Sequence, residues 1–380
     1  MKKIGQFFKK HWKKFLLAII IIAIIAGIIY LSFRAYDRYQ KNLLTDPAWI
    51  RENVELVKKD ENISIFNEDY QNIIEEKIDA LKDSVDYTLE NPLLVHNPYG
   101  TGTLSYYLYY TYSDEDLDYK IVTEGYSDFE KEISHKDNNE YQLIGFVPWE
   151  TNTLTLKSGD EEQAFTTTTP KSTAEIDNHL EIVDGDSSKD LTDGLYAVLG
   201  HDKNYNSNIY LYDNEGVIRE ELVLDSYRAD RIILDDDYMH YAYNKKGIVK
   251  VNDLGKIEKF YDLGNYTMHH DMVYDEDNNR FVILVNEDNT GKVKKILDMK
   301  DLLPEFYLNA VKPEGKNTYG DYELDWIHMN SLSLIGDDIV LSSRELSTII
   351  YISNAYTDPS VKYLLYSWRL RQWRVLLIFV

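Results

Sequence analysis

The second half of the sequence is built from a repeated strand–turn–strand unit, and this repeat restricts the fold more than any single residue does. Ile209–Leu224 reads IYLYDNEGVIREELVL and resembles Ile248–Leu263, which reads IVKVNDLGKIEKFYDL. Each segment has two apolar strands around a turn that ends in glycine, and the turn glycines, Gly216 and Gly255, are 39 residues apart. Strand units that recur at about 40–60 residues are typical of the blades of a β-propeller.

A second pair of segments repeats this design with polar residues at matching positions. His270–Glu287 and His328–Glu345 both begin with histidine, contain a turn with Asp or Asn, and end in a polar residue followed by glutamate. Asn286 therefore stands where Arg344 stands in the later segment. The repeats predict four blades within residues 190–358, at 193–224, 229–263, 268–303 and 327–355.

Equivalent positions of different blades converge on one axis, because the innermost strand of each blade lines the central channel of a propeller. The repeat therefore brings a set of polar residues to one mouth of the channel: His270 or its neighbour His269, His328, Asn330 and Arg344. Imidazole and amide groups together with a permanent cation are suited to binding an anion. The alternative is that each residue is an ordinary hydrogen-bonded polar group at a strand end.

Two of the segments before the repeat are residues 40–90 and residues 91–171. In residues 40–90, Tyr70–Leu81 has apolar residues at the spacing of one helix face, which predicts a helical stalk or a helix that packs against the next domain. Residues 91–171 contain a tyrosine-rich run at Leu104–Tyr112 and turn residues at short intervals, which predicts a β-sandwich. Thr166–Pro170 reads as a linker. The expected fold class is all-β.

Residues 1–39 have the pattern of a membrane anchor. Six lysines lie within the first fourteen residues and precede Phe15–Phe33, a run of nineteen uncharged, mostly apolar residues. A run of that length spans a bilayer as a helix, and the lysines stay on the cytoplasmic side. We therefore expect an uncleaved transmembrane signal anchor that crosses the cell membrane once and leaves the rest extracellular. A cleaved signal peptide is the alternative, although no A-x-A pattern precedes Arg34.

Composition excludes several kinds of site. The chain has no cysteine, which rules out disulfides, thiolate metal sites and a cysteine nucleophile. Its net charge of −24 argues against nucleic acid as a partner, and the absence of a glycine-rich phosphate-binding motif argues against a nucleotide cofactor. An acidic chain that binds an anion must concentrate positive charge locally, which directs attention to Arg344.

Several motifs resemble those of a known family. DWIHMNSL at Asp325–Leu332, DDIVLSSRELSTIIYIS at Asp337–Ser353 and MHHDMVYD at Met268–Asp275 are similar to segments of the bacterial arylsulfate sulfotransferases, whose sulfate donor is not a nucleotide. The run from Asn91 to Leu156 resembles that family's N-terminal β-sandwich, so the resemblance covers about Asn91–Asp358. It implies a six-bladed propeller behind the sandwich.

The resemblance also implies a reaction and a set of roles. Members of the family transfer a sulfuryl group from a phenolic sulfate ester to a phenol through a sulfurylated histidine, with neither cofactor nor metal, and a homodimer is one assembly that the resemblance allows. Carried over by motif, His328, Arg344 and Asn330 hold the sulfuryl oxygens. His270 is a further donor or proton-transfer group, and His269 is the alternative for that role because the doubled histidine leaves the register open. His270, His328 and Arg344 are therefore the predicted catalytic residues, and Asn330 and His269 the predicted substrate-binding residues.

The sequence departs from the family pattern at its C-terminal end. The family's nucleophilic histidine lies downstream of the Ser-Ser-Arg strand, but the last histidine here is His328. About four blades are expected where the family has six. Residues 359–380 hold four basic residues and no acidic one. We therefore expect a truncated product with an out-of-frame tail, marginally soluble because its sheet edges stay open. A genuine short form is the alternative.

Two other functions stay open at this point. A non-catalytic extracellular propeller for binding or sensing keeps the channel residues and needs no nucleophile. A metal-dependent hydrolase can be built from His269, His270 and His328, with Asp271 and Asp325 as further ligands. Dependence on a phenol acceptor or on a metal ion distinguishes these functions from sulfuryl transfer.

Overall fold

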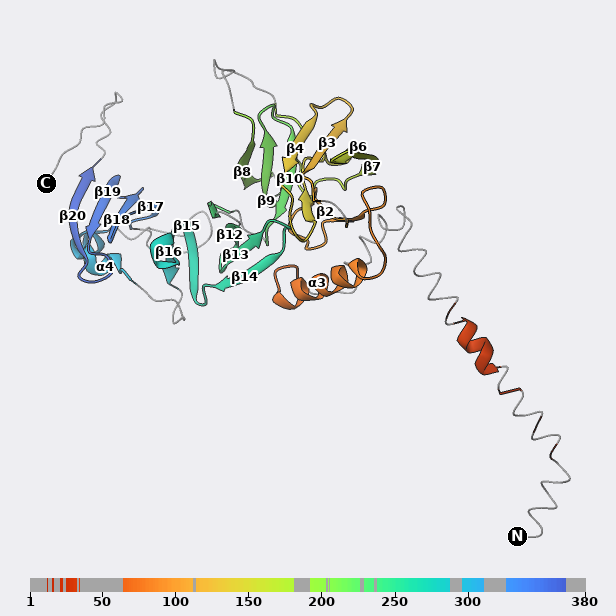
Figure 1. The fold of residues 1–380 in the computed structure, drawn as a ribbon. Coiled ribbons are helices and arrows are strands. Elements are labelled where there is room, and N and C mark those ends of the chain that lie inside the picture. The colour runs from red at the N-terminus through yellow and green to blue at the C-terminus, as the bar shows by residue number, and fades with distance from the viewer. Residues whose placement is uncertain are drawn as a thin grey trace, which may run out of the picture.

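The computed structural model describes an antiparallel β-protein, which confirms the all-β fold class (Figure 1). The described residues are 12, 16, 21–22, 25–32, 34, 64–111, 114–180, 192–202, 204, 206–225, 229–235, 238–287, 296–310 and 326–366. Two sheets form the first part of this region, and four sheets follow them in chain order.

The first two sheets pack face to face as a sandwich. One contains β1 (Leu93–His96), β2 (Tyr106–Tyr109) and β5 (Glu140–Leu143); the other contains β3 (Leu117–Thr123), β4 (Phe129–Ile133), β6 (Thr151–Ser158) and β7 (Glu161–Thr168). Burial alternates along β3 and β6, as it does in strands with one face toward a core. The shared core includes Leu108 and Tyr141 from the first sheet and Ile121 and Leu156 from the second.

Helix α3 (Glu68–Lys82) covers the outer face of the β1–β2–β5 sheet. Its N-cap, Asn67, accepts a hydrogen bond from the backbone N–H of Asp69 at 2.8 Å. Buried Tyr70, Ile74 and Ile78 recur every four residues and pack against that sheet. Of the two predictions for this segment, the structure shows a packing helix; residues 40–63 of the predicted stalk lie outside the described residues.

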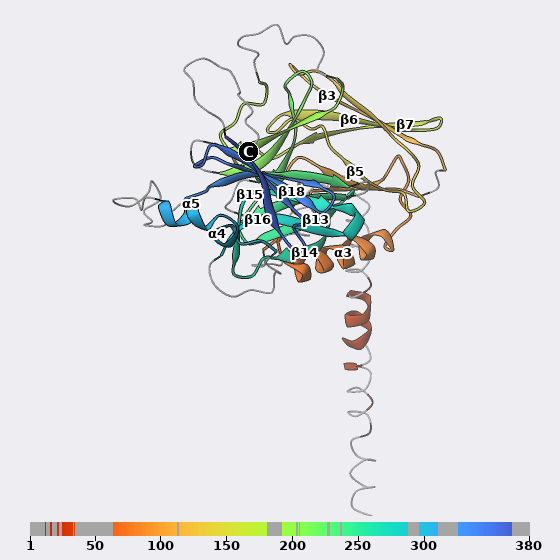
Figure 2. The same cartoon turned by 90° about the vertical axis from the view of Figure 1, so that its left-hand side faces the viewer.

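Four antiparallel sheets lie within residues 195–366. They contain β8 (Leu195–His201), β9 (Ser207–Asp213) and β10 (Ile218–Val223); then β11 (Ile232–Asp235), β12 (Tyr238–Asn244), β13 (Gly247–Asn252) and β14 (Ile257–Asp262); then β15 (Tyr266–Asp275) and β16 (Arg280–Glu287), joined by η1 (Glu276–Asn278); and finally β17 (Met329–Ile335), β18 (Asp338–Ser343), β19 (Thr348–Ser353) and β20 (Ser360–Tyr366). Helices α4 (Met299–Leu302) and α5 (Pro304–Asn309) precede the last sheet. Figure 1 shows the sheets one after another, and both Figure 1 and Figure 2 show α3 beside β14. The described residues do not show a closed ring, so the six-bladed propeller stays a prediction.

The last sheet extends beyond the predicted blade. Strand β20 pairs antiparallel with β19, with Ser353 opposite Ser360 and Thr348 opposite Tyr366. Val361 and Leu364 of β20 pack against the core of this sheet. The predicted boundary at 358/359 therefore falls just before the fourth strand. Residues 367–380 lie outside the described residues, and the out-of-frame tail stays a prediction.

A buried polar junction connects the sandwich to the first of the later sheets. Arg219 on β10 is fully buried, and its guanidinium donates to Asp213 Oδ2 at 2.7 Å, Gly145 O at 3.1 Å and Ser127 O at 2.7 Å. The next residue, Glu220, accepts a hydrogen bond from the backbone N–H of Leu104 at 3.0 Å. The two parts of the chain are thus joined by hydrogen bonds that are buried or partly buried, where they are stronger than in water.

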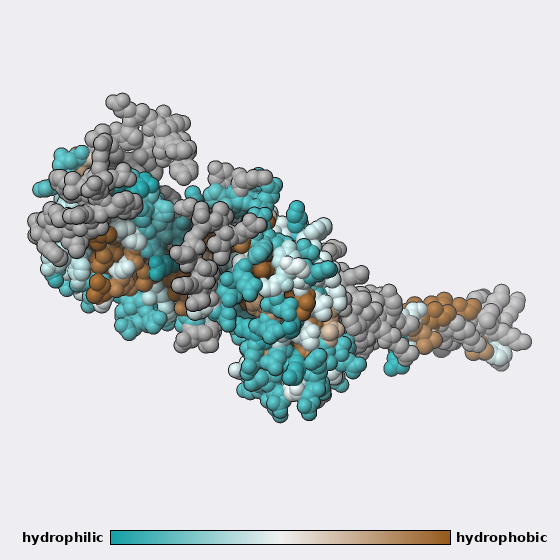
Figure 3. Space-filling view, turned by 90° about the horizontal axis from the view of Figure 1, so that it is seen from above, coloured by the Kyte–Doolittle hydropathy of each residue, from teal (hydrophilic) through white to brown (hydrophobic). Residues whose placement is uncertain are grey.

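The N-terminal region is described only in part. Residues 25–32 are helical, and Ile28, Ile29 and Leu31 are among their exposed side chains. Figure 3 shows a hydrophobic surface on the described part of the N-terminal region, at the right of the view. Among the described residues, no helix is long and apolar enough to cross a membrane. Most of the predicted anchor, residues 1–39, lies outside the described residues.

Candidate functional site

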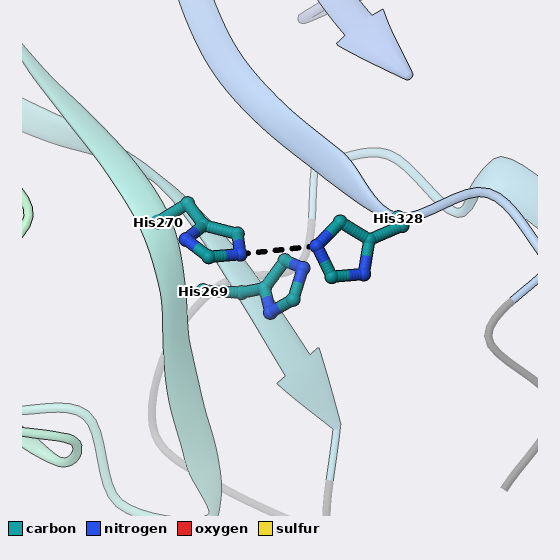
Figure 4. A group of neighbouring side chains, drawn as sticks. All are labelled: His269, His270 and His328. Atoms are coloured by element: carbon teal, nitrogen blue, oxygen red, sulfur yellow. Dashed lines mark hydrogen bonds between the residues drawn. The ribbon is translucent and has the colours of Figure 1, made fainter. Parts of the chain in front are cut away.

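Three histidines from two neighbouring sheets meet at one point (Figure 4). His269 and His270 lie on β15, and His328 lies immediately before β17. His270 Nε2 and His328 Nε2 share a hydrogen bond of 3.1 Å. The ring of His269 lies 4.4 Å from that of His270 and 4.8 Å from that of His328, measured between centroids. The structure thus brings together three of the five predicted site residues.

Bulges in the two strands explain how these side chains meet. Consecutive side chains of a regular strand point to opposite faces, so a doubled histidine should split across the sheet. The β15–β16 register instead shifts between Met268 and Met272, and His270 has a φ of 66°, in the left-handed region. His328, at the start of the other strand, has a φ of 38°. A bulge re-aims side chains in this way, and such backbone strain is characteristic of functional sites.

The Ser-Ser-Arg turn holds His328 in its unusual conformation. The Ser343 hydroxyl donates a hydrogen bond to the carbonyl of Ile327, on one side of His328. The backbone N–H of Arg344 donates to the carbonyl of His328 itself at 3.0 Å. Two consecutive residues of the motif therefore fix the peptide groups on both sides of this histidine, which gives the motif a structural role beside any chemical one.

Arg344 and Asn330 are the other two predicted site residues. The side chain of Arg344 is 56% exposed and pairs with the neighbouring Glu345 at 2.8 Å, and its backbone N–H donates to the carbonyl of His328. Asn330 is exposed and lies in a second register shift, between Met329 and Ser331. Asn330 is two residues after His328 along the chain, and Arg344 reaches His328 through a backbone hydrogen bond.

The carboxylates considered as metal ligands are placed differently. Asp271 is buried, and its two oxygens accept hydrogen bonds from the backbone N–H of Leu332 on β17 at 2.7 Å and from Arg231 at 3.1 Å. Asp271 therefore joins the sheets that carry the histidines. The group of converging metal-ligand side chains in the structure contains the three histidines and not Asp271. Asp325 lies outside the described residues.

Sequence reasoning missed three neighbours of the histidines. Asp230 Oδ2 lies 3.8 Å from His270 Nδ1, and Asn286 Nδ2 lies 3.4 Å from His269 Nδ1. Arg231 is bound to Asp271, the residue that follows His270. Asn286 could have been found, because the repeat aligns it with Arg344. Nothing in the local sequence marks Asp230 or Arg231, which precede β11 and reach the site only through packing of sheets.

Comparison with models of protein families identifies the family of the chain. The family model for arylsulfotransferase (ASST) matches residues 181–373, about half of the chain. The chain belongs to the arylsulfotransferase family. The matched part of this arylsulfotransferase contains the three histidines, Asn330, Arg344 and all four later sheets, β20 included. The model match begins after the sandwich, so the predicted resemblance of residues 91–171 stays a prediction. No curated protein matches the chain.

Proposed function

We propose that this arylsulfotransferase transfers a sulfuryl group from a phenolic sulfate ester to a phenol acceptor, and that the three histidines form its sulfuryl-binding centre. The observation that carries the proposal is the 3.1 Å approach of His270 Nε2 and His328 Nε2. Both atoms come from strained backbone positions inside the segment that the family model matches. Strain of this kind persists only where the surroundings hold it in place.

The proposed centre supplies donors for the oxygens of the sulfuryl group. An imidazole N–H donates a hydrogen bond, so the rings of His270 and His328 can each hold an oxygen of the group once it takes the place of their mutual hydrogen bond. Arg344 contributes its positive charge after its guanidinium turns from Glu345. That exchange costs little, because an ion pair between exposed side chains is worth at most about 1 kcal/mol. The amide of Asn330 is a further donor at the same edge.

Transfer through a sulfurylated histidine takes two steps. First the S–O(aryl) bond breaks, an S–N bond to a histidine forms, and the departing phenolate takes a proton from an imidazole of the centre. Then the acceptor phenol attacks sulfur, the S–N bond breaks, and the phenol proton returns to the imidazole. Donors placed beforehand stabilise charge that develops on the oxygens. His270 and His328 serve in binding and proton transfer, because their facing nitrogens can donate to the sulfuryl oxygens and to the departing phenolate.

The test uses the full chain with 4-nitrophenyl sulfate, with and without phenol. Release of nitrophenolate that requires phenol supports transfer, and mass spectrometry of the quenched protein locates any sulfurylated histidine. Binding of 4-nitrophenyl sulfate is measured separately by calorimetry, so that a chain that binds the donor without turnover is recognised as a binding centre alone. A chain that neither binds 4-nitrophenyl sulfate nor releases nitrophenolate would contradict the proposal. Release without phenol that a chelator abolishes would indicate a metal-dependent hydrolase.

We also propose that residues 15–33 anchor the protein in the cell membrane with the later part outside the cell. The lysines of the first fourteen residues and the exposed apolar side chains of residues 25–32 support this proposal. Membranes washed at alkaline pH should retain the full chain, and protease added to intact cells should digest its C-terminal part. Release of the chain by the alkaline wash is the contrary result.

A further inference from the structure

The three histidines also have the geometry of an incomplete metal-ligand shell. Each offers one ring nitrogen, and the three nitrogens lie within 4.8 Å of one another. Figure 4 shows the rings of His269, His270 and His328 gathered between β15 and the start of β17. Their side chains are partly buried, so an ion at this point is reached from solvent and still has protein around it.

The distances suit a tetrahedral ion. Nitrogen ligands of zinc lie about 2.0–2.1 Å from the metal, which places two of them about 3.3 Å apart in a tetrahedron. The 3.1 Å between His270 Nε2 and His328 Nε2 is close to that spacing before any metal binds. The nitrogen of His269 lies within 4.8 Å of the other two, so it has to approach them by at most about 1.5 Å.

The surroundings orient the rings for ligation. His270 Nδ1 faces the carboxylate oxygen Asp230 Oδ2 at 3.8 Å, whereas the Asn286 amide nitrogen, 3.4 Å from His269 Nδ1, is itself a donor. A ligand histidine commonly directs its second nitrogen at a carboxylate or another polar group, which fixes the ring and leaves the first nitrogen for the metal. For His270, the nitrogen that remains is the Nε2 directed at His328.

The geometry points to a reversible zinc-binding site in which His269, His270 and His328 are the ligands. Three imidazoles favour zinc and neighbouring transition metals over magnesium or calcium, which prefer oxygen ligands. The fourth position is left to water or to an anion. Because bound zinc occupies the nitrogens that the sulfuryl-binding centre uses, zinc inhibits transfer. Zinc binding itself does not rest on the proposed function, since it is measured without turnover.

The experiment titrates the tag-free full chain, stripped with a chelator, with Co²⁺ as a spectroscopic probe. Four-coordinate Co²⁺ at the three histidines should give visible absorption at one ion per chain, and added Zn²⁺ should remove it. His269→Gln, His270→Gln and His328→Gln should each weaken Co²⁺ binding at least tenfold. His179→Gln is the matched control, since His179 is exposed and belongs to a different part of the chain.

The outcomes separate this inference from the proposed function. If none of the three histidine variants changes Co²⁺ binding, the inference is overturned. A circular dichroism spectrum of each variant shows whether a loss of binding comes from a loss of folding. Metal binding at His269, His270 and His328 in a chain that shows no turnover supports the zinc site and contradicts the proposed sulfuryl transfer. If saturating Zn²⁺ leaves the phenol-dependent turnover unchanged, zinc does not inhibit transfer. Hydrolysis that is activated by Zn²⁺ would also contradict the inhibition.

Discussion

At the scale of single residues, the site depends on where the two facing histidines sit on the backbone. His270 and His328 both have positive φ, a conformation that costs about 1–3 kcal/mol for a residue other than glycine. Hydrogen bonds from Ser343 and Arg344 to the backbone around His328 offset part of that cost. The facing nitrogens are therefore held in place before any substrate arrives.

The doubled histidine gives the first prediction. His270→Gln should weaken binding of 4-nitrophenyl sulfate about tenfold or more, because it removes the ring nitrogen that shares a hydrogen bond with His328. His269→Gln should weaken binding less, because His269 contacts Asn286 at the edge of the centre. Calorimetry on the two variants measures both effects. The reverse order would assign the principal role to His269.

At the scale of secondary-structure elements, one carboxylate aligns the strands that carry the site. Asp271 on β15 accepts a hydrogen bond from the backbone N–H of Leu332 on β17 at 2.7 Å. A second bond, from Arg231, links the segment before β11 to the same carboxylate. Three sheets therefore share one buried group beside the histidines. The sequence suggested Asp271 as a metal ligand, whereas the structure gives it a positioning role.

The second prediction concerns this carboxylate. Asp271→Ala should lower the free energy of unfolding by about 1–3 kcal/mol, since it leaves the buried N–H of Leu332 without its acceptor. It should also weaken donor binding, because β15 and β17 lose their shared alignment. Urea unfolding and calorimetry measure the two effects. Asp277→Ala, at an exposed position of the same hairpin, is the control and should change stability by less than about 0.5 kcal/mol.

At the scale of the whole molecule, stability depends on the junction between the sandwich and the later sheets and on the open sheet edges. β8 is an edge strand on which Val198 and Leu199 are exposed. Such edges promote association, so the marginal solubility expected from the sequence stays a prediction. At the junction, burial raises the pKa of Glu220 to about 8, so its carboxyl is protonated in the folded protein under acidic and neutral conditions.

The third prediction is a pH dependence of stability. Glutamate in the unfolded chain has a pKa of about 4.3, so between about pH 4.3 and 8 the folded state binds a proton that the unfolded state has lost. The stabilising contribution of this proton is complete below the unfolded pKa and is lost as the pH rises through the folded pKa. Glu220→Gln, which resembles the protonated form, should therefore gain stability relative to the natural chain as the pH rises from 5 to 8.5. Urea midpoints at several pH values measure this difference, and a constant difference would show that Glu220 is not protonated in the folded state.

The sequence by itself determined the elements and their class. Alternation along the strands, apolar spacing in Tyr70–Leu81 and glycine at the turns are local patterns, and the strands, helix α3 and the order of sheets follow from them. The repeat also marked His270 and His328 as partners, although they are 58 residues apart. It could do so because residues at matching positions of a repeated unit occupy equivalent positions in the fold.

Only the tertiary structure decided how those side chains meet. Regular alternation predicts that His269 and His270 face opposite sides, and the bulge in β15 brings both to His328. The pairing of Arg344 with Glu345, the link from Asp271 to β17 and the burial of Glu220 depend on how residues pack around each group. Local sequence patterns describe which face of an element is apolar. They carry little information about bulges or about which polar groups lose their water, because both are set by contacts with distant parts of the chain.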